Sequence, residues 1–236
     1  SPSIEECGYS DRIIQLTAGN STITTQEAAK AIVAYGEWPA DQQYNKGQAV
    51  DKMTKPGPSV ERFYTLESFQ WTSNFKGRAY RLPGCLTDIG MFGQNCQYHY
   101  LLNTGYAIHV QVNATKFHAG MLYVGVIPEC QVSAEPQDIM ELQDEPFFAQ
   151  YPLHQLPIFP HQFINLRTNN SATIIVPYIN CNPSDSPLAH NNLTLVIAQV
   201  TSLSYGTGAA SYVPITVTIG PLNTSFSGIR NAVFAQ

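Results

Sequence analysis

Six histidines are the residues of this chain best suited to bind a metal ion or to move a proton near neutral pH. A compact metal site on a β-sheet protein would place two histidines one residue apart, with a carboxylate soon after them. No His-x-His occurs here, and the spacing of five of the six forms no ligand set: His99, His109, His118, His154 and His190. We therefore predict no metal and no cofactor.

Common catalytic and nucleotide-binding motifs are also absent from the sequence. There is no Gly-x-Ser-x-Gly turn for a serine nucleophile, and no glycine-rich loop precedes a helix in a phosphate-binding arrangement. The cysteines are odd in number, widely spaced and free of any Cys-x-x-Cys: Cys7, Cys85, Cys96, Cys130 and Cys181. This pattern indicates reduced thiols rather than a disulfide framework or a zinc knuckle.

Two further side chains could act chemically. His161 lies between Pro160 and Gln162, and its residue context alone predicts an ordinary loop histidine with its hydrogen bonds satisfied. Trp38 lies between Gly36 and Pro39 on a segment that precedes the main strands. It can either pack like any large apolar side chain or stack its indole on a nucleic-acid base.

The composition favours a protein whose surface meets other protein. The chain has 236 residues, of which only 12% are charged, whereas 13 are Tyr and 11 are Phe. An ordinary soluble domain carries about 25% charged residues, so much of this surface is expected to be covered. The net charge is -5, and six acidic residues lie between Glu129 and Glu145, a run that predicts a solvated loop. The sequence has no basic patch that would bind nucleic acid through its phosphates.

Eight short segments have the alternation or the apolar content of β-strands, and polar turns separate them. An additional segment, residues 91–102, places apolar side chains at helical spacing. No apolar run is long enough to span a bilayer. We predict an all-β protein, an eight-stranded antiparallel jelly-roll β-sandwich with an N-terminal β-hairpin arm and short helical insertions. The strands are residues 63–71, 78–82, 106–112, 121–127, 163–166, 173–176, 193–200 and 213–219.

Residues 159–178 contain two strand-like runs that flank a polar turn. Alternating side chains at 163–166 are followed by the polar run Thr168, Asn169, Asn170, Ser171 and then by the β-branched residues 173–176. The simplest prediction is two antiparallel strands paired through a tight turn.

The first part of the chain predicts an arm that precedes the sandwich. Residues 12–25 have the pattern of a β-hairpin with a Gly-Asn turn, which would gain stability by adding to an exposed sheet edge. Thr24 and Glu27 have the spacing of a capping box, which predicts a short helix over residues 26–33. We divide the chain into a hairpin and arm at 1–61 and a jelly-roll domain at 62–236.

Several motifs, taken in order along nearly the whole chain, resemble the picornavirus capsid proteins of the viral protein 2 type, in the enterovirus and sapelovirus branch. They are Gly8-Tyr9-Ser10-Asp11-Arg12, Gly19-Asn20-Ser21-Thr22-Ile23-Thr24, Tyr35-Gly36-Glu37-Trp38-Pro39, Arg62-Phe63-Tyr64-Thr65-Leu66, Asn113-Ala114-Thr115-Lys116-Phe117-His118-Ala119-Gly120, residues 159–178 and Phe226-Ser227-Gly228-Ile229-Arg230-Asn231. Two departures are a short connection from Pro128 to Phe159 and the sequence Arg78-Ala79-Tyr80, where many relatives have a Trp-rich strand.

The resemblance implies a structural protein of an icosahedral, non-enveloped RNA virus capsid, not a turnover enzyme. Its partners would be two other jelly-roll capsid proteins, a small internal capsid protein, symmetry-related copies of itself, viral genomic RNA on the inner face and a host receptor. It would assemble in the host cell cytoplasm, reside in the virion, and take part in attachment and genome release.

The resemblance also implies roles for particular residues. The hairpin would extend the sheet of a neighbouring pentamer, through Ile13, Ile14, Leu16, Thr22, Ile23 and Thr24. Trp38 would stack on RNA, and His161 would take part in the single maturation cleavage of the capsid precursor. Ser1 and Gln236 would be ends produced by processing.

Two other functions fit the predicted fold. A jelly-roll carbohydrate-binding module would use the abundant aromatic residues, but it has no need of the hairpin and arm. A metal-dependent jelly-roll oxygenase would need the missing His-x-His, and a metal analysis would test it.

Overall fold

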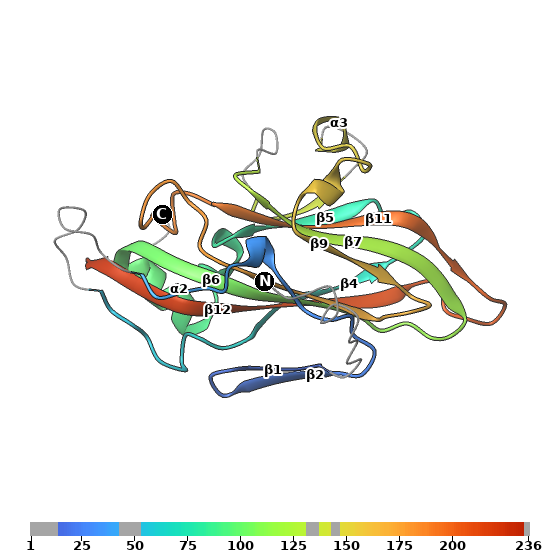
Figure 1. Ribbon diagram of the computed structural model, residues 1–236, viewed down its shortest axis with the longest axis horizontal. Helices are drawn as coiled ribbons and strands as arrows, with labels where there is room; N and C mark the ends of the chain where they lie inside the picture. The colour runs from blue at the N-terminus through green and yellow to red at the C-terminus, as the bar shows by residue number, and fades with distance from the viewer. Residues whose placement is uncertain (1–13, 43–52, 131–136, 143–146, 234–236) are drawn as a thin grey trace.

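A computed structural model describes residues 14–42, 53–130, 137–142 and 147–233. Two five-stranded sheets pack face to face, and a separate two-stranded hairpin lies beside one of them (Figure 1). We call the sheet next to the hairpin the hairpin-side sheet. The other, whose outer face is covered by residues 147–159, is the loop-side sheet. In the part of the chain that the structure describes, no helix is long and apolar enough to cross a membrane.

Strand order within each sheet defines the topology. The hairpin-side sheet has the order β3 (Ile32–Val33), β10 (Ser171–Val176), β6 (His99–Val112), β12 (Val213–Ile229), β4 (Tyr64–Trp71). The loop-side sheet has the order β8 (Ile139–Leu142), β5 (Gly77–Leu82), β11 (Leu193–Tyr205), β7 (His118–Pro128), β9 (His161–Asn165). The short helices are η1 (Ala34–Gly36), η2 (Gly84–Leu86), α2 (Gly90–Tyr98), α3 (Phe147–Gln150) and η3 (Leu156–Ile158).

The eight predicted strands form a jelly roll. Strands β4, β12, β6 and β10 are neighbours in one sheet, and β5, β11, β7 and β9 are neighbours in the other, so the chain passes repeatedly between the two sheets. Pairing is antiparallel except at the edge, where β3 runs parallel to β10. The short edge strands β3 and β8 were not predicted. The predicted helix over 91–102 is confirmed as α2, but its last residues belong to β6.

Alternating apolar side chains of both sheets form the core between them. On β12, Val213, Ile215, Val217 and Ile219 are fully buried, as the predicted alternation requires. Trp71 of β4 is also fully buried, and its indole N–H donates to the Gln199 side chain of β11 at 2.8 Å. This bond joins the two sheets through the half-buried Gln199 and supplies the acceptor that a buried indole N–H needs.

The prediction that residues 163–166 and 173–176 pair as a hairpin is wrong. Strand β9 pairs with β7 in the loop-side sheet, whereas β10 pairs with β6 in the hairpin-side sheet. The polar turn therefore carries the chain from one sheet to the other. The Asn169 amide holds this crossing, because it donates to the carbonyls of Phe163 and Ser171 at 3.1 and 3.0 Å and accepts from the Asn165 N–H at 2.9 Å.

The predicted helix over residues 26–33 is also wrong, because this segment is extended along the edge of β10. Ala28 forms a parallel bridge with Ser171, and β3 continues the pairing opposite Ile174 and Ile175. The Glu27 carbonyl accepts from the Asn170 N–H at 3.0 Å. Hydrogen bonds to an open sheet edge outweigh the weak helical preference of the segment.

The hairpin consists of β1 (Ile14–Ala18) and β2 (Ser21–Thr25), with Gly19 at a φ of +57° in the turn. One face of the hairpin packs on the outer face of the hairpin-side sheet. There Leu16 and Ile23 meet a small apolar cluster that contains Phe63, Ala107 and Ile175. The opposite face, which carries Gln15, Thr17, Thr22 and Thr24, is exposed.

Replacement of Asn169 by Ala should destabilise the fold. It removes three hydrogen bonds at a buried position and leaves buried backbone groups unpaired, so we expect the free energy of unfolding to fall by about 1–3 kcal/mol. Urea unfolding followed by tryptophan fluorescence would measure this. Arg167→Ala, on the exposed side of the same turn, is the matched control, and equal effects of the two substitutions would contradict the role of Asn169.

Candidate functional site

The hairpin offers main-chain edges for pairing. Its register pairs Ala18 with Ser21 and Thr17 with Thr22, and among the described strands β1 and β2 pair only with each other. Within the described part of the chain, both outer edges of the hairpin therefore have hydrogen-bonding groups available to another chain. The structure places the predicted residues Ile14, Leu16, Thr22, Ile23 and Thr24 on these two strands, while Ile13 lies outside the described residues.

Trp38 is only partly covered by the described residues, because 60% of its surface is exposed. The neighbouring Pro39 is anchored: its carbonyl accepts from the Asn223 side chain, and Gly105 lies close enough that a side chain there would collide with the proline ring. Tyr35 is also 57% exposed. Two large aromatic side chains are thus presented by an anchored segment.

His161 begins β9 on the outer face of the loop-side sheet. Its ring stacks on Tyr123 with centroids 5.6 Å apart and meets the edge of Phe163 at 5.1 Å. Its Nδ1–H donates to the Phe159 carbonyl at 2.8 Å, since a carbonyl can only accept. The neutral imidazole then carries its lone pair on Nε2, which can take a proton from water.

Three other histidines hold structural positions. His109 is buried, bonds to the Thr173 hydroxyl at 2.9 Å, and has its pKa lowered by burial. His99 bonds to the Asn95 carbonyl at 3.0 Å, and His118 bonds to the Ala210 carbonyl at 2.8 Å. His154 is exposed. Among the described residues no group of His, Cys, Asp and Glu could hold a metal ion.

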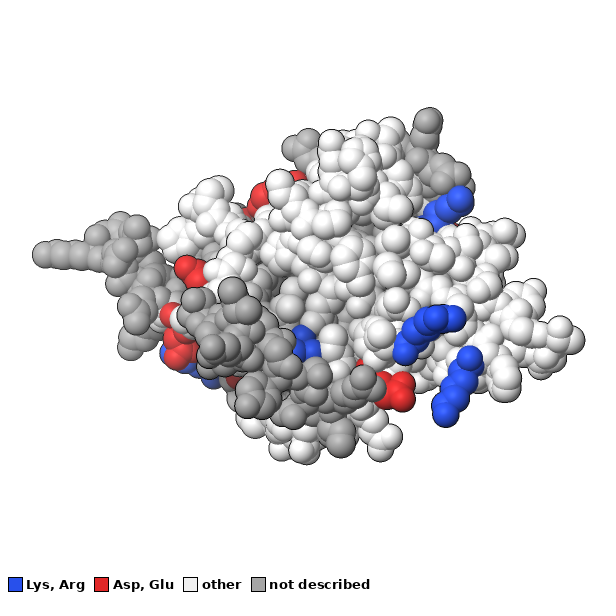
Figure 2. Space-filling view, turned by 45° about the vertical axis from the view of Figure 1, so that its right-hand side comes forward, with Lys and Arg blue, Asp and Glu red and all other residues white. Residues whose placement is uncertain are grey.

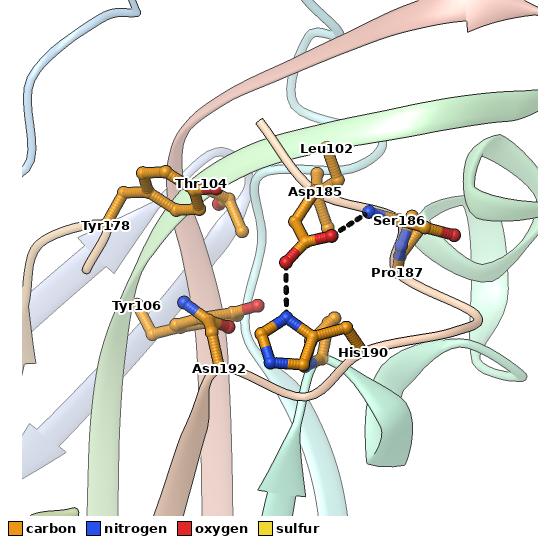
Figure 3. Close-up of a pocket in the computed structure, with 10 residues that line it drawn as sticks. Leu102, Thr104, Tyr106, Tyr178, Asp185, Ser186, Pro187, His190 and Asn192 are labelled. Atoms are coloured by element: carbon orange, nitrogen blue, oxygen red, sulfur yellow. Dashed lines mark hydrogen bonds and ion pairs between the residues drawn. The ribbon is translucent and has the colours of Figure 1, made fainter. Parts of the chain in front are cut away.

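His190 forms a cluster with two carboxylates that the sequence analysis missed. Its Nδ1 meets Asp185 (Figure 3), and its Nε2 lies 3.0 Å from Glu129. Glu129 follows β7 with a φ of +49°, and its N–H donates to the Asn192 carbonyl at 3.0 Å. Glu129 and His190 are 61 positions apart in sequence, so no local motif could have indicated their contact, whereas Asp185 and His190 are only 5 apart.

The cluster perturbs the ionisation of its members. Burial opposes the charged form of His190, but hydrogen bonds to Glu129 and Asp185 outweigh it and raise the His190 pKa. Burial likewise opposes the charge on Asp185, but hydrogen bonds from Asn180, His190 and Ser186 outweigh it and lower the Asp185 pKa. Arg81 and Asp138 line the open hollow beside His190.

Four of the five cysteines lie among the described residues, and none of these four is in a disulfide there. Cys85, Cys96, Cys130 and Cys181 are free thiols in the structure, and Cys7 lies outside the described residues. Burial is the main cause that raises the pKa of Cys85 and Cys96. These two buried thiols are therefore poor nucleophiles. The ends Ser1 and Gln236 also lie outside the described residues.

Comparison with known proteins identifies the family. A family model described as picornavirus capsid protein matches residues 24–205. The chain belongs to the picornavirus capsid proteins. It is 50% identical over 244 residues to the genome polyprotein of Bovine enterovirus (strain VG-5-27), covering 99% of this chain and 11% of the polyprotein. It is 50% identical over 256 residues to that of Human rhinovirus 3, covering 98% of this chain and 12% of the polyprotein.

The identification confirms the predicted resemblance to picornavirus capsid proteins and the predicted jelly roll. This family is structural rather than catalytic. The capsid function is therefore preferred over the two alternatives, a carbohydrate-binding module and a metal-dependent oxygenase. This capsid protein spans about a tenth of the length of the polyproteins that it matches, 11% for the bovine virus.

Replacement of His190 by Gln should destabilise the capsid protein in a pH-dependent way. Because the folded pKa of His190 is raised, its stabilisation is fully present below its ordinary value and is lost as the pH rises through the raised value. Because the Asp185 pKa is lowered, its contribution is present above its ordinary value and is lost as the pH falls through the lowered value. The cluster therefore stabilises the fold most in the window between the ordinary pKa of an aspartate and the ordinary pKa of a histidine, and this stabilisation declines outside that window.

Thermal unfolding would therefore show a larger loss for His190→Gln at a pH of about 6 than at about 8.5. The exposed His154, replaced in the same way, is the control. A loss of equal size at both pH values would contradict a charged His190 in the folded protein.

Proposed function

We propose that this chain is the viral protein 2 type of capsid component, which assembles in the host cell cytoplasm with two other jelly-roll capsid proteins, a small internal protein and further copies of itself. The shell would enclose viral RNA, attach to a host receptor and release the genome through rearrangement between pentamers. The observation that carries the proposal is the hairpin with two open edges in front of a jelly roll.

Surface charge supports the proposal. Figure 2 shows a broad area of one face with no charged side chains, with Lys and Arg lying near its margin. Only 12% of the residues are charged. A freely diffusing protein usually carries more charge, because charge keeps it soluble and prevents association. An uncharged face suits a protein that is covered by neighbours in a closed shell.

Hairpin pairing would join one pentamer to the next. In a two-residue hairpin the pair next to the turn is hydrogen-bonded, and the next pair directs its N–H groups outward. The register places Thr17 and Thr22 in that second pair. Added strands bind through such outward groups.

Thr22→Pro should thus prevent pentamers from joining, because proline removes the outward N–H while the edge of the hairpin tolerates it. Sedimentation velocity should show pentamers in place of closed shells. Thr22→Val keeps the N–H and is the matched control. Closed shells formed at the normal yield by Thr22→Pro would refute the role of the hairpin edge.

His161 would act in the maturation cleavage. Its fixed Nδ1–H bond to Phe159 leaves Nε2 as the basic atom, which could deprotonate a water near the scissile carbonyl. His161→Ala should cause the uncleaved precursor to accumulate in assembled particles, as measured by immunoblot. His154→Ala is the control, since it removes a histidine from an exposed loop. Normal cleavage in the His161 variant would exclude it as the base.

Trp38 would stack on an RNA base at the inner face of the shell. Its indole is exposed, and an aromatic ring can stack on any base regardless of the RNA sequence. Each such stacking contact contributes about 1–3 kcal/mol of binding free energy. Ultraviolet cross-linking of particles followed by mass spectrometry should find RNA attached near Trp38. The attachment should vanish in Trp38→Ala and persist in Trp38→Phe. Unchanged cross-linking in the alanine variant would count against stacking.

A further inference from the structure

Tyr106 has a buried hydroxyl that makes no hydrogen bond to the described residues. The residue lies on the central strand β6, and only 1% of its surface is exposed. Burial is the main cause that raises its pKa, so the phenol stays neutral and retains its donor hydrogen. Buried hydroxyls in folded proteins almost always have a partner, either in the protein or in ordered water.

A small cavity lies at this hydroxyl. It has a volume of about 10 Å³, and its walls include Tyr106, Thr104, Asp185 and His190. Figure 3 shows the Tyr106 hydroxyl directed toward the space between Asp185 and His190. One water molecule needs a cavity of about 10–15 Å³, so this cavity is the size of a single water.

The Asp185 carboxylate has an acceptor position to spare. Oδ1 accepts from the Ser186 N–H at 2.8 Å, and Oδ2 accepts from the Asn180 amide at 2.8 Å and from His190. A carboxylate offers about four acceptor positions, and these bonds occupy three. The remaining position is on Oδ1.

Neighbouring polar groups make other hydrogen bonds, and none of the described residues bonds to the Tyr106 hydroxyl. The Thr104 hydroxyl bonds to the Gly105 carbonyl at 2.9 Å and to the Thr224 hydroxyl at 2.9 Å. The Asn192 amide donates to the Ile179 carbonyl at 2.9 Å. Strand β6 and the segment that carries Asp185 are also fixed to each other, because Leu102 and Asp185 exchange backbone bonds of 2.8 and 3.1 Å.

We propose that this cavity binds one ordered water molecule, which accepts the Tyr106 hydroxyl hydrogen and donates to Oδ1 of Asp185. Two polar partners are within the usual range for a buried water. A Mg²⁺ or Ca²⁺ ion does not fit, because it needs six or more oxygen ligands and the charge of Asp185 is already matched by His190. The volume excludes a larger ligand.

The water would extend the cluster of His190, Asp185 and Glu129 into the core. It links Tyr106 on a central strand to Asp185, and Asp185 is linked through His190 to Glu129 after β7. Residues 180–192 are then held to both sheets by one continuous set of hydrogen bonds. This linkage does not depend on the role proposed for the hairpin, His161 or Trp38.

A high-resolution structure of purified particles that contain this chain would test the site. We expect a density peak within hydrogen-bond distance of both Tyr106 Oη and Asp185 Oδ1. A map that shows other buried waters but none here would overturn the proposal. This test uses the unaltered protein, so it holds even if a variant fails to fold.

Tyr106→Phe gives an independent test by the sign of its effect. If the hydroxyl is paired with a water, its removal breaks a hydrogen bond, and the melting temperature should fall by a few degrees with loss of the density peak. If the hydroxyl is unpaired, its removal relieves a penalty, and an unchanged or higher melting temperature would overturn the proposal. Tyr123→Phe, which loses a direct bond of 2.8 Å to the Leu156 carbonyl, is the reference for a paired hydroxyl.

Discussion

Burial of the central strands on both faces is the constraint on which the rest of this capsid protein depends. All six residues of β10 are buried, and β6 is buried along most of its length. One face of these strands meets the core, so the other face needs a cover of its own. The arm supplies it, as Leu16 and Ile23 pack on Ala107 and Ile175. Each Å² of apolar surface removed from water contributes about 25 cal/mol to the stability of the fold. Burial of this outer face therefore favours the path of the arm that covers it.

The same constraint explains which elements the sequence could predict. The alternation at 213–219 and the continuous apolar run at 121–127 each identify a strand and its burial without knowledge of its partners. Pairing is a different matter, because it depends on contacts remote in sequence. The two strands around Asn169 therefore looked like a hairpin, although they belong to opposite sheets, and residues 26–33 looked helical, although an open edge of β10 holds them extended.

The basicity of each histidine likewise depends on neighbouring side chains that cannot be identified from the sequence. His109 loses basicity because it is buried, whereas His190 gains it from two carboxylates that reach it from separate loops. The role proposed for His161 rests on its motif alone, and the stacked Tyr123 beside it could not be inferred from the sequence.

The two strands that the sequence did not predict, β3 and β8, both lie at sheet edges and have only two and four residues. Short edge strands give a foreign strand few consecutive partners. The opposite edges are β4, with eight residues, and β9, with five. The edges of the hairpin-side sheet therefore differ: strand addition is disfavoured at the two-residue β3 and is easier at the eight-residue β4. A protein made in many copies at high local concentration would be protected in this way from disordered aggregation while it remains able to join its neighbours in a defined direction.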